Sequence, residues 1–169
     1  CKLFFKVLLG RLYTDCENRN VFSPFQFAFR REHGTADALF IIDQIMEQGN
    51  LLNLDYHLAF FDISKAFDRV NRDLLWLSLL SIGYSGKLTR ILKSHYKNTQ
   101  MRYTLNGITT DFMRTQRGLP QGCVLSPFLF SIFINKVYET LAEKGYGITL
   151  GKHSDNIKIP ILLFADDIV

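Results

Sequence analysis

Residues 56–63 read YHLAFFDI and residues 160–167 read PILLFADD, and these two stretches decide the fold. Both are short and rich in aromatic or branched apolar residues, which is typical of buried strands. The first stretch carries Asp62 near its end, and the second ends in the pair Asp166 and Asp167. Because an isolated buried carboxylate is costly, such groups are normally paired or bind a metal ion. We therefore expect the three carboxylates to converge on Mg²⁺, which prefers oxygen ligands, although an Asp-Asp pair after a strand also forms turns or helix caps.

The spacing of apolar residues predicts helices on both sides of the first stretch. One helix is expected over residues 2–15, and a second begins at Thr35 as N-cap and ends at Gly49. After Asp62, a further helix is expected over residues 71–83, and another begins near Ser85.

The middle of the chain predicts a β-hairpin. Residues 100–106 and 108–115 flank an Asn106-Gly107 pair, which is the strongest short signal for a tight hairpin turn. Residues 117–122 (RGLPQG) fit no regular structure, and Ser126-Pro127 then begins a long helix that ends near Gly145. With a last strand over residues 159–164, the order of elements predicts an α+β fold with a mostly antiparallel sheet packed by helices.

Composition favours one globular domain. The chain has 169 residues, 47% of them hydrophobic, and 20 Lys and Arg against 16 Asp and Glu give a net charge of +4, which excludes a disordered chain. No apolar run reaches the roughly 18 residues of a membrane span, and a secretory signal is not expected. Cys1, Cys16 and Cys123 are odd in number and lack metal-binding spacing, which favours a reducing intracellular compartment. The chain begins with Cys1 instead of Met and ends directly after the second acidic stretch, so we expect a fragment.

Positive charge is concentrated between residues 87 and 117. This segment has seven basic residues and one acid, Asp111, and aromatic residues lie in or beside it. Basic side chains would meet phosphates and aromatic side chains would stack on bases. The alternative is a solvated basic face with the hairpin aromatics buried. The basic residues are Lys87, Arg90, Lys93, Lys97, Arg102, Arg114 and Arg117, and the aromatics are Tyr84, Tyr96, Tyr103 and Phe112.

Four segments in order resemble the reverse transcriptase domain, and more narrowly the enzymes of non-LTR retrotransposons. They are residues 26–39 (QFAFRREHGTADAL), 60–70 (FFDISKAFDRV), 117–127 (RGLPQGCVLSP) and 164–167 (FADD). The resemblance implies an RNA-directed DNA polymerase with a palm-like fold. Residues 1–169 would form a single partial domain of fingers and palm, truncated at both ends and without a thumb.

The resemblance also implies the reaction. Asp62, Asp166 and Asp167 would be the catalytic and metal-binding residues, holding two Mg²⁺ ions for which Mn²⁺ is a substitute. The reaction would transfer a deoxynucleotide from a dNTP to a primer 3′-hydroxyl, mostly by positioning and charge stabilisation. Asp68 is expected to be structural, because Lys65 and Arg69 lie close to it in the sequence.

A set of nucleotide-binding residues follows from the same resemblance. Ile63, Phe67, Gln121 and Gly122 would bind the incoming nucleotide, with Phe67 stacked under the sugar so that it collides with a 2′-hydroxyl. The alternatives are a core Phe67 and an ordinary loop at residues 119–122. The charge of the basic segment adds contacts to nucleic acid, with a solvated side chain as the alternative for Arg117. The seven residues expected to make such contacts are Gln26, Arg30, Arg31, Lys93, Lys97, Arg102 and Arg117.

The implied partners are an RNA template, a DNA primer, dNTPs and the element RNA in a ribonucleoprotein particle, without a membrane, in the cytoplasm and nucleus. The family's upstream Lys/Arg pair that clamps the triphosphate and its downstream thumb are missing, so we expect the fragment itself to be inactive, with an unfinished sheet edge. Two alternatives remain: an inactive RNA-binding remnant, and a group II intron or retron-type enzyme. A viral-type RNA polymerase is disfavoured by the aromatic Phe67.

Overall fold

A three-stranded antiparallel sheet contains parts of both acidic stretches. The computed structural model describes residues 2–151 and 156–169. In the sheet, β1 (Phe61–Asp62) pairs with β9 (Asp167–Ile168), and β9 pairs with β8 (Leu163–Phe164). The segment before α2 lies along β8, where Phe27 N donates to Leu163 O over 3.0 Å and Leu163 N donates to Phe25 O over 2.9 Å. Strand β8 is thus joined to a segment more than 130 residues earlier in the chain.

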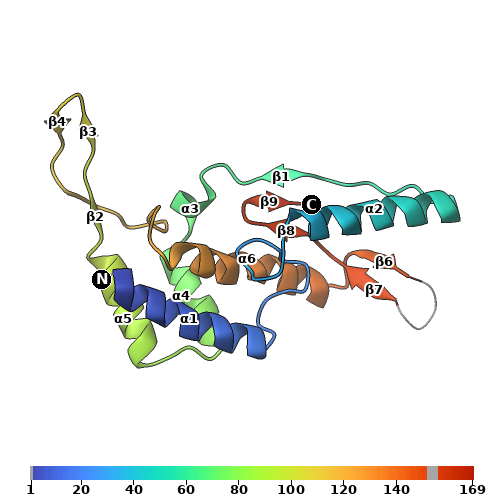
Figure 1. Cartoon of the computed structure of the whole chain (residues 1–169), viewed down its shortest axis with the longest axis horizontal. Helices are drawn as coiled ribbons and strands as arrows, with labels where there is room; N and C mark the ends of the chain where they lie inside the picture. The colour runs from blue at the N-terminus through green and yellow to red at the C-terminus, as the bar shows by residue number, and fades with distance from the viewer. Residues whose placement is uncertain (1, 152–155) are drawn as a thin grey trace.

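Helices form the larger core. The long helix α6 (Ser126–Glu143) runs through the middle of the molecule, beside α1 (Lys2–Asn18), α4 (Arg72–Ser81) and α5 (Lys87–Lys97) (Figure 1). Their apolar faces meet in one cluster that includes Leu12, Leu79, Leu92 and Leu129, each almost fully buried. None of the helices in the described ranges has both the length and the apolar character that crossing a membrane needs.

A smaller core lies under α2 (Thr35–Leu52). It contains Phe25, Phe27, Ile45, Ile159 and Leu162, and it joins α2 to the hairpin of β6 (Ile148–Leu150) and β7 (Ile157–Ile159). The short helix α3 (Ala66–Arg69) follows β1 and leads into α4. The α+β class with mostly antiparallel strands is therefore confirmed.

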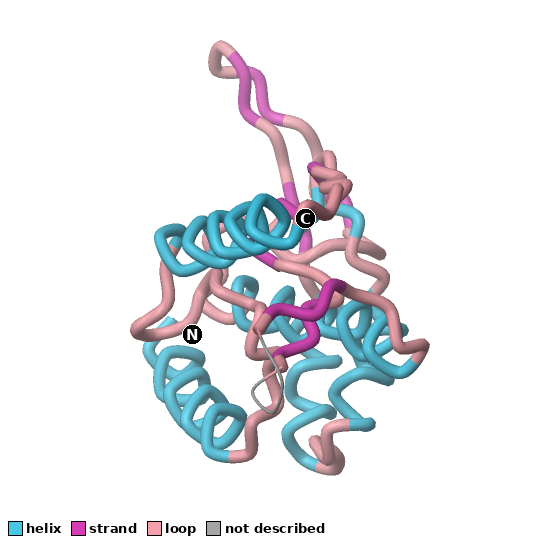
Figure 2. The backbone as a smooth tube through the Cα atoms, turned by 90° about the vertical axis from the view of Figure 1, so that its right-hand side faces the viewer, coloured by secondary structure: helices cyan, strands magenta, loops and turns pink. Residues whose placement is uncertain are grey.

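The predicted hairpin is confirmed and projects away from the body, as Figures 1 and 2 show. Its base is β2 (Gln100–Met101) with β5 (Met113–Arg114), and its tip is β3 (Thr104–Leu105) with β4 (Ile108–Thr109). Asn106 and Gly107 have φ values of 49° and 79°. Both values are those of a two-residue turn whose twist matches the flanking strands.

The expectation of two buried strands at the acidic stretches is wrong in part. In residues 56–63 only Phe61–Asp62 form a strand, and Phe60 and Phe61 are 68% and 61% exposed. The reason is that β1 is the edge strand, and no other strand in the described ranges pairs with its free side. In residues 159–164 only Leu163–Phe164 belong to the three-stranded sheet. Ile159 is the last residue of β7, and Pro160 lies between β7 and β8. The β6–β7 hairpin was not predicted.

The helix boundaries were predicted to within a few residues, but three caps are shifted. Gly34, not Thr35, caps α2, and its N–H donates to the Asp37 carboxylate over 2.6 Å. Gly49 lies inside α2 and not at its end, because Asn53 takes the left-handed cap conformation and Leu54 N returns to Gly49 O. Ser126 is the first residue of α6, and its hydroxyl donates to Pro120 O.

Candidate functional site

The register of the sheet brings the three predicted acids together along the backbone. Asp62 on β1 lies directly opposite Asp167 on β9, and Ile63 N donates to Asp166 O over 3.2 Å. Directly opposite residues of an antiparallel pair present their side chains on the same face, about 4.5–5.5 Å apart at Cβ. Two carboxylates from positions 105 residues apart therefore share one face of the sheet.

A two-residue turn between β8 and β9 presents the third acid. Phe164 pairs with Asp167, so Ala165 and Asp166 form the turn. Ala165 has a φ of 56°, a region that glycine adopts freely and alanine adopts at a cost. Strained backbone of this kind persists only where the surrounding structure holds it, and it is concentrated at functional sites.

The carboxylates are accessible and have no ion pair within the described residues. Asp62 and Asp167 are exposed and Asp166 is half-buried, while the ion pairs of the described chain involve other acids. Exposed carboxylates on adjacent strands are donors that suit Mg²⁺. Their side chains are nevertheless not gathered into a ready cation site, since the described residues contain no group of three acidic, His or Cys side chains placed to hold an ion.

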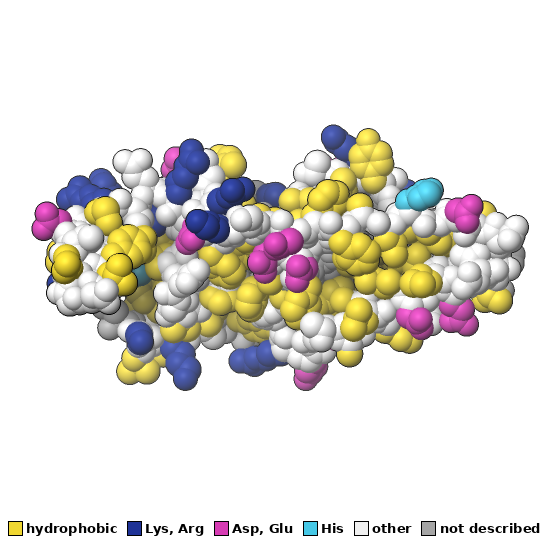
Figure 3. Space-filling view, turned by 90° about the horizontal axis from the view of Figure 1, so that it is seen from above, with side chains coloured by type: hydrophobic (Ala, Val, Ile, Leu, Met, Phe, Trp, Pro, Cys, Tyr) yellow, Lys and Arg dark blue, Asp and Glu magenta, His cyan; other side chains and the backbone are white. Residues whose placement is uncertain are grey.

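An apolar hollow of about 400 Å³ borders the acids. It lies between α2 and the sheet, and Asp62 and Asp167 stand at its wall together with Leu39, Phe60 and Phe61. In Figure 3, acidic side chains gather near the middle of the upper face, with apolar side chains toward the right and most Lys and Arg toward the left. Acidic, apolar and basic side chains therefore occupy different parts of this face.

Phe67 is half-buried and has a fixed ring. Its ring stacks on Phe130 with 4.7 Å between centroids and an interplanar angle of 18°. Phe29 meets it edge-on at 6.2 Å and 83°. The alternative of a core Phe67 therefore holds in part: the ring packs against the core, yet it keeps an accessible portion. Its predicted role in nucleotide selection stays a prediction.

The loop of residues 117–122 is held against α3. Gly118 N donates to Val70 O over 2.9 Å and Leu119 N donates to Phe67 O over 2.8 Å. A Cβ at Gly118 would lie 2.7 Å from Asp68 O, so only glycine permits this approach. Beyond it, Gln121 and Gly122 are exposed, and nothing lies within 4 Å of a Cβ built at Gly122. The side of the loop predicted to face a nucleotide is thus open.

Arg72 is a key residue that the sequence analysis missed. It is 8% exposed, and it donates to the carbonyl oxygens of Gly118, Tyr96, Thr115 and Arg117 and to the Thr115 hydroxyl. Burial lowers the pKa of Arg72, and within the described residues no carboxylate pairs with it. Arg72 thus links α4 to α5 and to the loop of residues 117–122 through hydrogen bonds. Its only sequence signal was its place after Asn71, which accepts from the N–H groups of Asp73 and Leu74 as the N-cap of α4.

The basic segment forms an exposed surface. Lys93, Lys97 and Arg114 border a hollow of about 440 Å³ that also reaches Trp76 and Tyr96. On the hairpin, Arg102 lies over the Phe112 ring at 5.1 Å. Residues 100–114 are exposed throughout, including Tyr103 and Phe112. The alternative in which the hairpin aromatics are buried is therefore wrong, although Tyr96 on α5 is fully buried.

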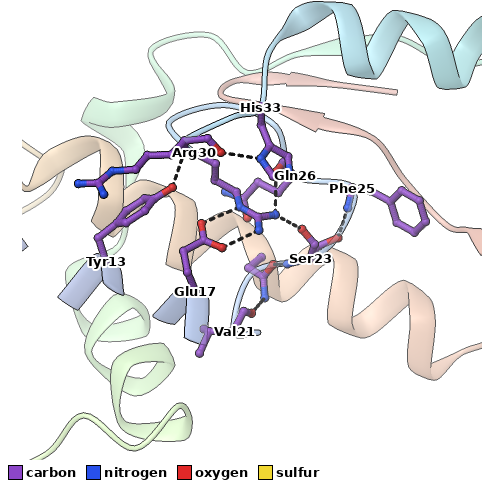
Figure 4. A network of polar contacts seen from close by, with 10 residues as sticks. Tyr13, Glu17, Val21, Ser23, Phe25, Gln26, Arg30 and His33 are labelled. Carbon is purple, nitrogen blue, oxygen red and sulfur yellow. Dashed lines mark hydrogen bonds and ion pairs between the residues drawn. The ribbon is translucent and has the colours of Figure 1, made fainter. Parts of the chain in front are cut away.

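Three other predicted nucleic-acid contacts lie elsewhere, and two of them are used internally. Gln26 is 2% exposed, and its Nε2 donates to Ser131 O over 3.3 Å. Arg30 forms an ion pair with Glu17 at 2.7 Å and also donates to Ser23 O and Gln26 O, as Figure 4 shows. Arg31 is exposed, with its guanidinium over the Tyr13 ring. In this structure Gln26 and Arg30 hold the loop before α2, and their contacts to nucleic acid stay untested.

Comparison with known proteins places this arrangement in a family. The sequence model of the protein family "Reverse transcriptase (RNA-dependent DNA polymerase)" matches residues 1–169, so the chain belongs to the reverse transcriptase family. Among its relatives are the RNA-directed DNA polymerase from mobile element jockey of Drosophila funebris, 29% identical over 94% of this chain, and the Pol polyprotein from type-1 retrotransposable element R2 of Popillia japonica, 29% identical over 99%. The resemblance to the non-LTR group is confirmed. The chain spans 18% and 23% of the lengths of these two relatives.

Proposed function

We propose that this chain is the part of an RNA-directed DNA polymerase of a non-LTR retrotransposon that carries the carboxylates for nucleotidyl transfer. The observation that carries the proposal is the register of β1 and β9, which sets Asp62 opposite Asp167 and next to Asp166. The family match over residues 1–169 supports it. Residues 1–169 would be a single partial domain of a longer polypeptide.

The proposed chemistry depends on the three acids. Asp62, Asp166 and Asp167 would hold two Mg²⁺ ions, or Mn²⁺ in their place, by small rotations of side chains that are already accessible. When bound, the ions lower the pKa of the primer 3′-hydroxyl and neutralise the charge that develops on the leaving pyrophosphate. The primer 3′-oxygen would bond to the α-phosphorus of a dNTP as the bond to pyrophosphate breaks. The turn at Ala165 would hold the backbone of Asp166 and Asp167 in place while their side chains rotate toward the ions.

The nucleotide would lie between Phe67 and the open side of the loop. The exposed amide of Gln121 offers both donors and acceptors, and the space beside Gly122 lets a ligand approach the backbone. Ile63 joins β1 to the turn through its N–H and would contribute backbone to the same pocket. Phe67 would select against the 2′-hydroxyl of a ribonucleotide.

The RNA template and the DNA primer would use the basic surface. Lys93 and Lys97 on α5, with Arg102 and Arg117, project positive charge that suits a phosphate backbone. Exposed Tyr103 and Phe112 offer faces for stacking on bases. We further propose that the parent protein binds its element RNA in a ribonucleoprotein particle and acts in cytoplasm and nucleus.

Primer extension by the full-length polypeptide tests the proposal. Asp62→Asn should abolish extension on an RNA template with dNTPs and Mg²⁺, because one of the two carboxylates on a shared sheet face is lost. Asp68→Asn is the matched control, since it makes the same change on exposed α3 nearby and should extend normally. Extension that survives Asp62→Asn would reject the assignment. RNA binding without extension by the unaltered protein would indicate an RNA-binding remnant. We expect little or no turnover from residues 1–169 alone.

A further inference from the structure

Phe29 has a backbone conformation that its side chain does not favour. Its φ is 61°, in the left-handed region, where a bulky residue is a genuine outlier. The ring is 46% exposed, so burial of its own apolar surface does not explain the position. Such strain persists only when the surrounding structure holds the residue in place.

The backbone on both sides of Phe29 is held. Before it, Phe27 is buried and its N–H donates to Leu163 O on β8. After it, Arg30 is fixed by the ion pair to Glu17 and by two backbone carbonyls, as Figure 4 shows. Because the chain is held at Phe27 and at Arg30, a change of φ at Phe29 would disturb one of these contacts.

The contact that this conformation creates is with Phe67. The two rings meet edge-on at 6.2 Å, which is a favourable arrangement for an aromatic pair. The same Phe67 ring is stacked on Phe130, which is 2% exposed, and its backbone carbonyl accepts from Leu119 N. The Phe67 ring thus has two aromatic contacts among the described residues, the buried Phe130 and the exposed Phe29, while Leu119 holds its backbone.

We propose that Phe29 is a positioning residue for Phe67, and that it thereby contributes to the choice between deoxyribonucleotides and ribonucleotides. The inference rests on the proposed function, in which Phe67 excludes the 2′-hydroxyl. A ring that excludes one oxygen atom must be held to within a fraction of an ångström. The edge-on contact of Phe29, whose strained backbone is held on both sides, restrains the Phe67 ring in this way.

The test is single-nucleotide incorporation by the full-length polymerase, with kcat and KM measured separately for a dNTP and the matching rNTP. Phe29→Ala should lower the dNTP/rNTP ratio of kcat/KM by roughly 3- to 10-fold, the range expected for one aromatic pair, through a lower KM for the rNTP. Phe29→Tyr keeps the ring and should keep the ratio. Phe29→Gly removes the ring and also the backbone strain, so it should stay folded and show the same lowered ratio. Phe40→Ala, a 63% exposed phenylalanine on α2, is the matched control.

A double mutant separates positioning from a general loss of structure. Phe67→Ala should lower the ratio more than Phe29→Ala does, and Phe29→Ala in that background should change it no further. An unchanged ratio in Phe29→Gly, or full additivity with Phe67→Ala, would overturn the inference while leaving the proposed polymerase intact. Absence of incorporation by the unaltered protein, or an unchanged ratio in Phe67→Ala, would overturn the proposed function or its nucleotide gate, and this inference with it.

Discussion

The Gly118→Ala substitution gives the sharpest test of how the loop of residues 117–122 is held against α3. The new Cβ would lie 2.7, 2.8 and 3.0 Å from the O, Cα and C atoms of Asp68, all of them backbone atoms that cannot rotate away. Gly118 also has a φ of 79°, which costs alanine about 1–2 kcal/mol. Moving the loop would break the bonds to Val70 O and Phe67 O, at about 1 kcal/mol each. The expected loss of unfolding free energy is therefore about 3–4 kcal/mol.

Gly122→Ala is the matched control within the same loop. Its φ is 84°, so the backbone cost is the same, but nothing lies within 4 Å of its Cβ. Thermal unfolding should show a Tm lower by roughly 6–16 °C for Gly118→Ala and by roughly 2–8 °C for Gly122→Ala, at about 2–4 °C per kcal/mol for a chain of this size. Urea unfolding gives the free energies directly. Equal losses for the two variants would refute the argument that contact with Asp68 requires glycine at position 118.

Two further outcomes follow from the polar contacts. Arg72→Met should lower the unfolding free energy by about 3 kcal/mol, because buried carbonyl oxygens lose their donor, and a loss below about 1 kcal/mol in urea unfolding would show that water replaces the guanidinium. Hydrogen bonding to Arg30 holds the pKa of Glu17 below its ordinary value of 4.5. The ionised Glu17 therefore stabilises the fold fully above pH 4.5, and this stabilisation is lost as the pH falls through the lowered pKa. Urea midpoints from pH 6 downward should therefore fall more steeply for the wild type than for Glu17→Gln, and parallel curves would contradict this.

Signals that act over a few residues predicted their structures well. The Asn106-Gly107 turn formed as expected because both residues tolerate positive φ, and Gly145 with a φ of 71° follows the end of α6 for the same reason. Asn71 caps α4 with its own side chain. One local signal was misread: Gly49 stays helical because Asn53, four residues later, takes the left-handed conformation and supplies the cap.

Burial and partners of polar residues could not be predicted in the same way. Gln26 and Arg30 were expected to contact nucleic acid, but these loop residues bond instead to Ser131 on α6 and Glu17 on α1. The YHLAFFDI stretch has the composition of a buried strand, yet Phe60 and Phe61 are exposed because β1 lies at the edge of the sheet. The composition of a segment indicates whether its side chains favour burial, but the neighbouring segments in the fold determine whether they are buried.

The sequence by itself determined the family and the α+β class and singled out the three acids as candidates, because local patterns and the order of motifs carry this information. Only the tertiary structure decided that Asp62 stands opposite Asp167, that Gly118 touches Asp68, and that Phe29 touches Phe67. The physical reason is that strand register and ring contacts join residues far apart in the chain. Their geometry is set by the packing of the whole domain and not by spacing along the sequence.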